Sequence, residues 1–299
     1  MVLRRLGYIT TALGSGAITD KSCHLRSATP ERLRALIRAN LAGLAATLDY
    51  NRAIGVRFYR LSSQLIPFAS HPVNTLEWWR EEEETLAAIG RTIQRDGVRC
   101  GMHPGQYTLL TSPDERVTAN ALADLAWHVR LLRALGLGRE AKIVIHGGGA
   151  YGDKAAAMRR FVARYRALPE EWREHLVLEN DERVYSVADV LAIHEATGIP
   201  IVFDAFHHAI LPTPGDLLPR VFATWQPEDG PPEVHFSSQA PGKPPGTHAD
   251  DVDPVDCAAF LAAAPAPPFD CMLECKRKDL ALLALRPALA ALGIVEREA

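Results

Sequence analysis

Short runs of β-branched and aromatic residues alternate with longer amphipathic segments from one end of the chain to the other. The short runs are typical of strands, and the segments between them have the periodicity of helices. We predict eight strands from this pattern: LGYIT from Leu6, VRFYRLS from Val56, VRCGMHP from Val98, KIVIHGG from Lys142, LVLEND from Leu176, IPIVFDAFH from Ile199, EVHFSS from Glu233 and DCMLECK from Asp270.

The segment between the first two strands shows the helical pattern clearly. Thr29 is a residue type that caps helix N-termini, and Pro30 suits the first helical position because its missing N–H would be unpaired there anyway. The apolar side chains that share one face of this helix are Leu33, Leu36, Ile37 and Leu44.

These β-then-α units predict an α/β fold, a (β/α)8 TIM barrel, which we expect to form one catalytic domain over residues 1–299. An open, doubly wound sheet is the alternative. Against it, the first strand leads into TTALGSG and not into the GxGxxG turn of a dinucleotide-binding unit. The Pro- and Gly-rich stretches at 227–232 and 238–248 flank the seventh strand, and we predict loops there.

The composition is that of a globular protein, with 47% hydrophobic and 23% charged residues. A formal net charge of −3 lacks the basic excess of a simple nucleic-acid binder, although bound divalent cations would change the local sum. The 5 cysteines form no repeated CxxC pattern, so they indicate neither a disulfide framework nor a zinc finger. With no apolar segment of signal-peptide or membrane-span length, we expect a cytoplasmic protein with no membrane partner.

Histidines and carboxylates gather where the predicted strands end, which is where barrel enzymes place their chemistry. Any one of them alone is more often a hydrogen-bonded structural residue. The set comprises His103, His146, His207 and His235 at strand ends, His71 and His248 in loops after strands two and seven, and Glu179, Asp204 and Glu274 at the same level of strands five, six and eight.

Carboxylates that end neighbouring strands would repel one another unless cations neutralised them, and imidazole at the same level is a ligand for first-row transition metals. A single tetrahedral zinc takes four ligands, which is fewer than this set offers. The pattern therefore predicts two or three divalent ions bridged by Asp or Glu. Such a cluster stabilises both the attacking and the leaving oxygen in phosphoryl chemistry.

Two predicted loops add features that suit a nucleic acid. HPGQYTLL, from His103, places Gln106 and Tyr107 beyond a strand end, where an aromatic ring can stack on bases or wedge between them. Packing of Tyr107 under a neighbouring loop is the alternative. HGGGAYGDK, from His146, offers a glycine-rich backbone and then Lys154 for a phosphate.

Other conspicuous residues receive no function from the pattern. The Trp78–Trp79 pair and the acidic run at 81–84 indicate a core anchor and the solvated first turn of a helix. His208, which directly follows His207, stays open. The histidines that we expect on the surface or in packing are His24, His128, His175 and His194.

The ordered motifs resemble those of the ultraviolet damage endonucleases, barrel nucleases similar to the endonuclease IV group. The resemblance extends from Leu6 to about Asp279. It is carried by LGY at Leu6, YRLSSQLIPFASHP at Tyr59, HPGQYTLLTSP at His103, HGGGAYGDK at His146, LENDE at Leu178, DAFHH at Asp204, HFSSQ at His235, GTHADDVD at Gly246 and MLECKRKD at Met272.

This resemblance implies a manganese-dependent enzyme that nicks UV-damaged double-stranded DNA immediately 5′ of a cyclobutane pyrimidine dimer or 6-4 photoproduct. The products would carry a 3′-hydroxyl and a 5′-phosphate, and we expect a monomer that works at the nucleoid. Gln106 and Tyr107 would lie in a loop that probes the helix opposite the damage, with Tyr8 beside them. The implied metal ligands are His71, His103, His146, Glu179, Asp204, His207, His235, His248 and Glu274.

Two positions depart from the family pattern. Glu233, two residues before His235, stands where some members have Lys, and it is an additional candidate ligand. The early GY is followed by ITTA, where related sequences often have Pro, an acid and Asn. From this first loop we therefore carry over only Tyr8.

As catalytic residues we predict Glu179, which would bridge ions that activate water and hold the scissile phosphate, and Lys154, which would lie near that phosphate. One alternative is a sugar isomerase or epimerase on the same barrel, which also uses manganese. Such an enzyme normally needs fewer ligands and would give the Gln106–Tyr107 loop no task. A non-catalytic damage-binding protein is the second alternative.

Overall fold

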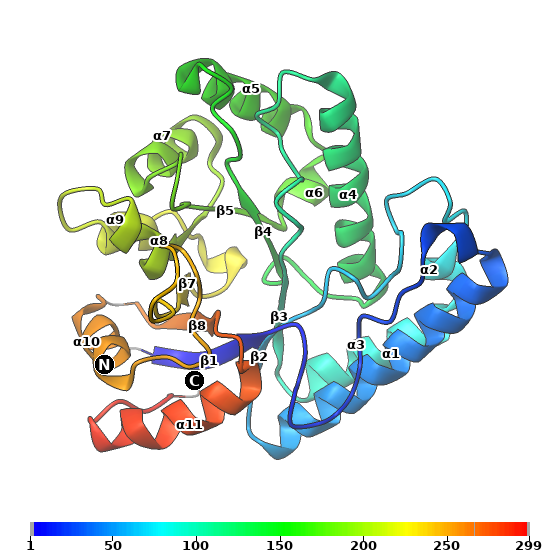
Figure 1. The fold of residues 1–299 in the computed structure, drawn as a ribbon, viewed down its shortest axis with the longest axis horizontal. Coiled ribbons are helices and arrows are strands. Elements are labelled where there is room, and N and C mark those ends of the chain that lie inside the picture. Colours follow the sequence, from blue (N-terminus) through cyan, green and yellow to red (C-terminus); the bar gives the residue numbers. More distant parts are fainter. Residues whose placement is uncertain (1–2, 266, 298–299) are drawn as a thin grey trace.

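A closed barrel of parallel strands forms the centre of the computed structural model, which describes residues 3–265 and 267–297 (Figure 1). Each strand pairs with the next along the chain, and the last pairs with the first. Both the predicted strands and the predicted TIM barrel are confirmed. The strands are β1 (Leu3–Ile9), β2 (Phe58–Arg60), β3 (Arg99–Met102), β4 (Lys142–His146), β5 (Leu176–Glu179), β6 (Ile201–Asp204), β7 (Glu233–Phe236) and β8 (Phe269–Leu273).

Helices surround the barrel and connect its strands (Figure 1). The two ends of the described chain meet beside β1, where the Arg297 amide donates to the carbonyl of Leu3. The α-helices are α1 (Pro30–Ala53), α2 (Trp78–Glu81), α3 (Glu83–Arg95), α4 (Glu115–Ala134), α5 (Lys154–Ala167), α6 (Glu170–Arg173), α7 (Val187–Thr197), α8 (Ala205–Ile210), α9 (Leu218–Phe222), α10 (Pro254–Ala263) and α11 (Lys278–Ala291). Two short 3-10 helices are η1 (Leu25–Ser27) and η2 (Pro227–Asp229).

Helix α1 begins where its sequence predicts. The Thr29 side chain accepts a hydrogen bond from the Arg32 amide, and Pro30 is the first helical residue. Of the apolar face, Leu33, Ile37 and Leu44 are buried in the core, whereas Leu36 is half-buried. Among the described residues, no helix combines the length and the apolar character needed to cross a membrane.

Apolar and charged side chains together fill the barrel below the C-terminal ends of its strands. The apolar residues are Val144, Val177, Val202 and Trp225. The Arg99 guanidinium lies 2.8 Å from an Asp270 carboxylate oxygen, and the Lys142 ammonium lies 2.6 Å from Asp229. All four charged groups are buried and paired, which suits a structural role at this end of the barrel.

Strand register brings the predicted site residues together at the C-terminal edge of the barrel. His146 of β4 pairs with Glu179 of β5, and Asp204 of β6 pairs with His235 of β7. Residues in register on neighbouring parallel strands point to the same side of the sheet. Four of the predicted ligands are therefore adjacent because of the sheet alone.

Candidate active site

Glu179 is the centre of the polar cluster at the C-terminal edge. It ends β5 and is fully buried. One carboxylate oxygen accepts a hydrogen bond from His235 Nδ1 at 2.7 Å, and the other accepts one from His103 Nε2 at 3.1 Å. His146 Nε2 lies 3.6 Å from the latter oxygen. A single carboxylate thus faces histidines from three other strands or strand ends.

Three groups of ligand-type side chains share Glu179, and within each group the candidate ligand atoms lie within 4.8 Å of one another. They combine Glu179 with His103 and His146, with Asp204 and His207, and with His235 and Glu274. Asp204 Oδ2 is buried and has no hydrogen-bond partner among the described residues. A buried oxygen left unpaired beside nitrogen and oxygen donors fits a divalent cation.

The buried carboxylates and histidines of this cluster shift one another's pKa values. Burial opposes a charged imidazole, but Asp204 and Glu179 outweigh it and raise the pKa of His207 to about 9. The same opposition at His235 is overcome by Glu179 and Glu274, so that its pKa rises to about 10. Burial also raises the pKa of Asp204, so the charged form of this carboxyl depends on a positive neighbour such as His207. The carboxylates therefore attract positive charge, which histidine protons supply here and a bound cation would supply instead.

Two charged residues support His235 from the side away from Glu179. Arg60, at the end of β2, places its guanidinium 2.8 Å from His235 Nε2 and pairs with Glu274. Glu233 Oε1 lies 3.1 Å from the same nitrogen. A carboxylate on the outer nitrogen of an imidazole fixes the orientation of the ring. Glu233 is thus placed to orient His235, while its candidate role as a ligand stays a prediction.

Sequence reasoning missed three residues that hold the cluster in place. Asn180 bonds both the amide and the carbonyl of Asp204, and its own carbonyl lies 3.0 Å from His207 Nδ1. His128, which we assigned to the surface or to packing, is fully buried and contacts the Ser63 hydroxyl at 3.0 Å. Ser63 in turn donates to the carbonyl of His103. Only their places in LENDE and YRLSS marked Asn180 and Ser63.

The two loop histidines belong to none of the three groups found in the described residues. His71 is exposed, and its Nδ1 accepts a hydrogen bond from the Val73 amide. His248 donates through Nδ1 to the carbonyl of Glu274, and its ring centroid lies 6.2 Å from that of His207. Their roles as ligands stay predictions. His208 packs its ring 5.1 Å from Phe203 and is in none of the groups found in the described residues.

The loop between β3 and α4 presents Gln106 and Tyr107 to solvent. Tyr107 is 78% exposed, the highest value among the exposed large hydrophobic residues of the described chain. Asp124 of α4 accepts a hydrogen bond from the Thr108 hydroxyl at 2.6 Å, which holds the loop where it leaves Tyr107. An exposed ring on a supported loop is not the packed tyrosine of the alternative interpretation.

Tyr8 differs from our expectation of a residue beside the lesion. Its side chain is fully buried between the barrel and α1, where the hydroxyl donates to Asn51 at 2.6 Å. Its ring packs 5.1 Å from that of Tyr59. Because none of its surface reaches solvent, Tyr8 contributes to the core and has no surface to offer a duplex. Tyr8 is hidden because β1 is covered on both faces.

Lys154 lies at the start of α5 and is already paired. Its ammonium contacts the Asp189 carboxylate at 2.5 Å and lies 5.7 Å from the centre of the Tyr185 ring. The side chain is 39% exposed, so the ammonium is within reach of solvent. A phosphate contact by Lys154 stays a prediction, and it requires a change of partner.

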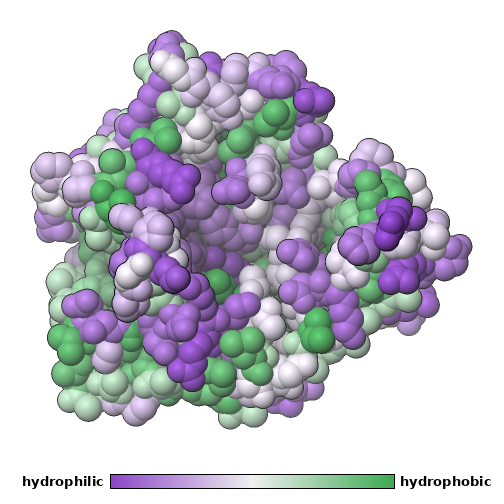
Figure 2. Space-filling model, viewed as in Figure 1, coloured by the Kyte–Doolittle hydropathy of each residue, from purple (hydrophilic) through white to green (hydrophobic). Residues whose placement is uncertain are grey.

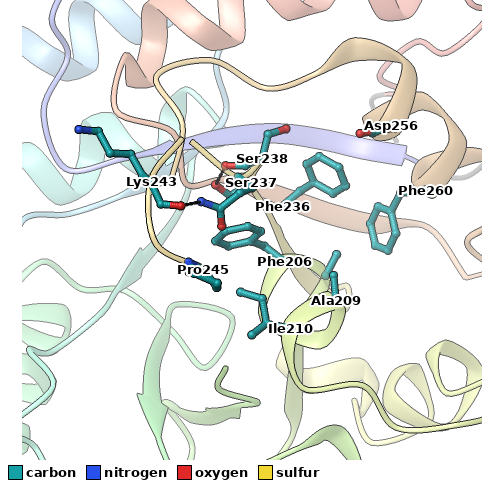
Figure 3. A pocket seen from close by; sticks show the side chains of 12 residues that line it. Phe206, Ala209, Ile210, Phe236, Ser237, Ser238, Lys243, Pro245, Asp256 and Phe260 are labelled. Atoms are coloured by element: carbon teal, nitrogen blue, oxygen red, sulfur yellow. Dashed lines mark hydrogen bonds between the residues drawn. The ribbon is translucent and has the colours of Figure 1, made fainter. Parts of the chain in front are cut away.

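A cavity of about 580 Å³ lies beside the cluster, between α8 and the loop after β7 (Figure 3). Phe206 separates the two, since its ring lies 5.1 Å from the His248 ring and also lines the cavity. Apolar side chains, including Phe236 and Phe260, form much of its wall, and Lys243 and Asp256 stand at the edges (Figure 3). The combination of aromatic walls and a few polar groups at the edges is typical of a ligand-binding cavity.

The surface around the site is hydrophilic and hollowed. Figure 2 shows a depression over the barrel strands that is lined mostly by hydrophilic residues. The fold and this site define the class of the protein: a (β/α)8 barrel with a candidate metal centre at the C-terminal ends of its strands.

Comparison with known proteins identifies the family. The family model described as UV-endonuclease UvdE matches residues 9–298. A UV DNA damage endonuclease of Bacillus velezensis is 36% identical over 278 residues, which cover 91% of this chain and 87% of that protein. A protein of the same name from Bacillus cereus is 36% identical, covering 99% of this chain and 98% of its own length. The chain belongs to the UV-endonuclease family.

Solved structures agree with this assignment. The crystal structure of SacUVDE matches with a TM-score of 0.92 and 36% identity, covering 98% of this chain and all of that one. An L-ribulose 3-epimerase matches with a TM-score of 0.57 and 20% identity. At that identity the epimerase shares the barrel alone, so it does not favour the sugar epimerase alternative.

Proposed function

We propose that this protein nicks UV-damaged double-stranded DNA immediately 5′ of cyclobutane pyrimidine dimers and 6-4 photoproducts, with divalent manganese as its cofactor. The observation that carries the proposal is the set of three ligand groups that share Glu179. They lie at the barrel edge where such folds perform chemistry, in a chain whose relatives are named UV DNA damage endonucleases.

The residues present suit two or three ions. His103 and His146 would hold one with Glu179, Asp204 and His207 a second, and His235 and Glu274 a third. His248, beside His207, and His71, on the loop after β2, would complete the coordination. The mixture of imidazole and carboxylate donors is compatible with manganese. Divalent ions at this place supply positive charge to the phosphate and lower the pKa of water.

Incision would break the bond between phosphorus and the 3′-oxygen. Water adds its oxygen to phosphorus and loses a proton, the 3′-oxygen departs and gains one, and the phosphate stays on the 5′ end of the downstream strand. Glu179 and Asp204 are buried carboxylates that hold the positive charge of the site in place. Lys154 would exchange Asp189 for the phosphate. No side chain needs to act as a nucleophile.

Recognition of damage would use the exposed Gln106–Tyr107 loop and the cavity beside Phe206. Tyr107 is free to enter a duplex and stack where bases have separated, a contribution of about 1–3 kcal/mol per base. A damaged pair is already weakened, so a lesion leaves the stack more readily than an intact pair does. The apolar cavity offers space for a base taken out of the helix.

Irradiated supercoiled plasmid tests the proposal. With manganese, the protein should relax the plasmid in proportion to the UV dose and leave unirradiated plasmid supercoiled. Chelation should stop the reaction. Tight binding to irradiated plasmid without relaxation would instead favour a damage-binding protein. Neither binding nor relaxation, together with epimerisation of a ketose, would favour the sugar enzyme.

A further inference from the structure

Tyr151 stands out on the loop that joins β4 to α5. Its backbone has a φ of 52°, a left-handed conformation that is costly for a residue with a large side chain. Glycines at 147, 148, 149 and 152 surround it, so the sequence places the one large side chain where glycine would fit best. Nevertheless the ring is not hidden, because Tyr151 is 45% exposed.

The Tyr151 ring lies near the backbone of Gly149 and the side chain of Arg160. Gly149 approaches the ring so closely that a Cβ on this glycine would lie 3.1 Å from it. Arg160 belongs to α5, and its guanidinium lies 5.9 Å from the centre of the Tyr151 ring. Arg160 is itself fixed, since its Nε donates to the carbonyl of Thr111 at 2.7 Å. Among the described residues, no carboxylate lies within 4.0 Å of Arg160, so its charge is available to an anion.

The Tyr151 loop and the Gln106–Tyr107 loop are packed as one unit. Gly148 has a φ of 90°, and a Cβ there would lie 2.7 Å from side-chain atoms of both Leu109 and Thr111. Arg164 of α5 donates to the carbonyl of Leu110 at 2.8 Å. The exposed rings of Tyr107 and Tyr151 are therefore carried by neighbouring loops that are braced against each other.

We propose that Tyr151, with Arg160 beside it, is a second stacking platform for a nucleobase of the bound DNA. This inference rests on the proposed function and adds a contact to it. A tyrosine ring has few rotatable bonds and so loses little conformational freedom when a base stacks on it, and an adjacent guanidinium attracts the phosphate backbone. Backbone strain retained at an exposed aromatic residue is typical of a functional position.

The test compares substitutions chosen for the left-handed backbone. Tyr151→Asn removes the ring but keeps a residue that tolerates this conformation, and Tyr151→Phe keeps the ring. Leu292→Asn, at an exposed position after α11 with a φ of −89°, is the control for loss of a large apolar group from the surface. Single-turnover nicking of a duplex with one defined photoproduct, in manganese and at increasing protein concentration, separates the half-saturating concentration from the maximal rate. Melting temperature is measured for every variant.

Tyr151→Asn should raise the half-saturating concentration about tenfold and leave the maximal rate and melting temperature within error. Tyr151→Phe and Leu292→Asn should stay within about twofold of the wild type. The inference would be overturned if the half-saturating concentration of Tyr151→Asn equalled that of the wild type, or if the Asn and Phe variants were weakened equally. Nicking by the wild type would still support the proposed function in either case. A wild type that does not nick this duplex would overturn both.

Discussion

Replacement of Glu179 by Gln should remove the response of the protein to divalent metal while leaving the barrel folded. The variant keeps the size of the side chain and removes the charge that all three ligand groups share. Glu179 accepts hydrogen bonds from His235 and His103, and charged hydrogen bonds of this kind contribute about 1.5–3 kcal/mol each at most. Since the amide oxygen of Gln still accepts one of these hydrogen bonds, we expect the free energy of unfolding of the metal-free variant to fall by about 2 kcal/mol.

The expected rise in melting temperature follows from the free energy of metal binding. A site occupied at a ligand concentration of about 100 times its Kd stabilises the folded state by about 2.7 kcal/mol. For a chain of this length, each kcal/mol corresponds to roughly 2 °C in melting temperature. Manganese should therefore raise the melting temperature of the wild type by about 5 °C per occupied site, and that of Glu179→Gln by much less.

Thermal melts of metal-depleted protein during manganese titration measure this difference, and nicking of irradiated plasmid follows in the same samples. Glu140→Gln is a suitable control, because this exposed carboxylate lies at the other end of the barrel, before β4. It should behave as the wild type in both assays. A Glu179→Gln variant with the full manganese shift, or with wild-type turnover, would refute the placement of Glu179 at the centre of the site.

Three further predictions address the cofactor, recognition and stability. Exhaustive chelation should abolish nicking and manganese should restore it; persistent activity in metal-free protein would contradict a metal centre. Replacement of Gln106 and Tyr107 by Ala should weaken cutting of damaged duplex about tenfold or more at unchanged metal content, and equal losses on a flexible substrate with a lowered melting temperature would indicate a structural role. Burial opposes the charge of Asp229, but Arg139 and Lys142 outweigh it and lower the pKa of this carboxyl. The ionised Asp229 therefore stabilises the folded state above the unfolded-state pKa near 4, and this contribution is lost as pH falls. Asp229→Asn should therefore cost about 3–5 kcal/mol in urea unfolding at pH 7 and less at pH 3; an equal cost at both would contradict this pairing.

The fold could be predicted because its strands are recognisable from local sequence. Each is a short β-branched run between amphipathic segments, and the order of units leaves few topologies to consider. The ligand groups followed from the fold, since the ends of parallel strands converge at one edge of a barrel. Glu179 and His146, for example, are 33 positions apart in sequence and adjacent in the sheet.

Other features depend on packing that the pattern does not reveal. Both faces of β1 are covered, so alternation of polar and apolar residues does not tell that Tyr8 points toward Asn51 of α1. Arg60 sits in an apolar strand as an isolated charge, and its partner Glu274 is 214 positions away. The positions of loop residues such as His71 follow from local turns and not from strand geometry. Strand register could therefore be predicted from the sequence, whereas the packing of individual side chains and the local conformation of loops could not.

The most direct test of the central claim is the position and chemistry of the cut. A duplex with a single defined 6-4 photoproduct, labelled at both ends of the damaged strand, is incubated with the protein and manganese, and the products are sized. We predict one incision immediately 5′ of the lesion, with a 3′-hydroxyl that a polymerase extends and a 5′-phosphate on the downstream fragment. An intact strand, equal cutting of undamaged duplex, or a break 3′ of the lesion would contradict the account.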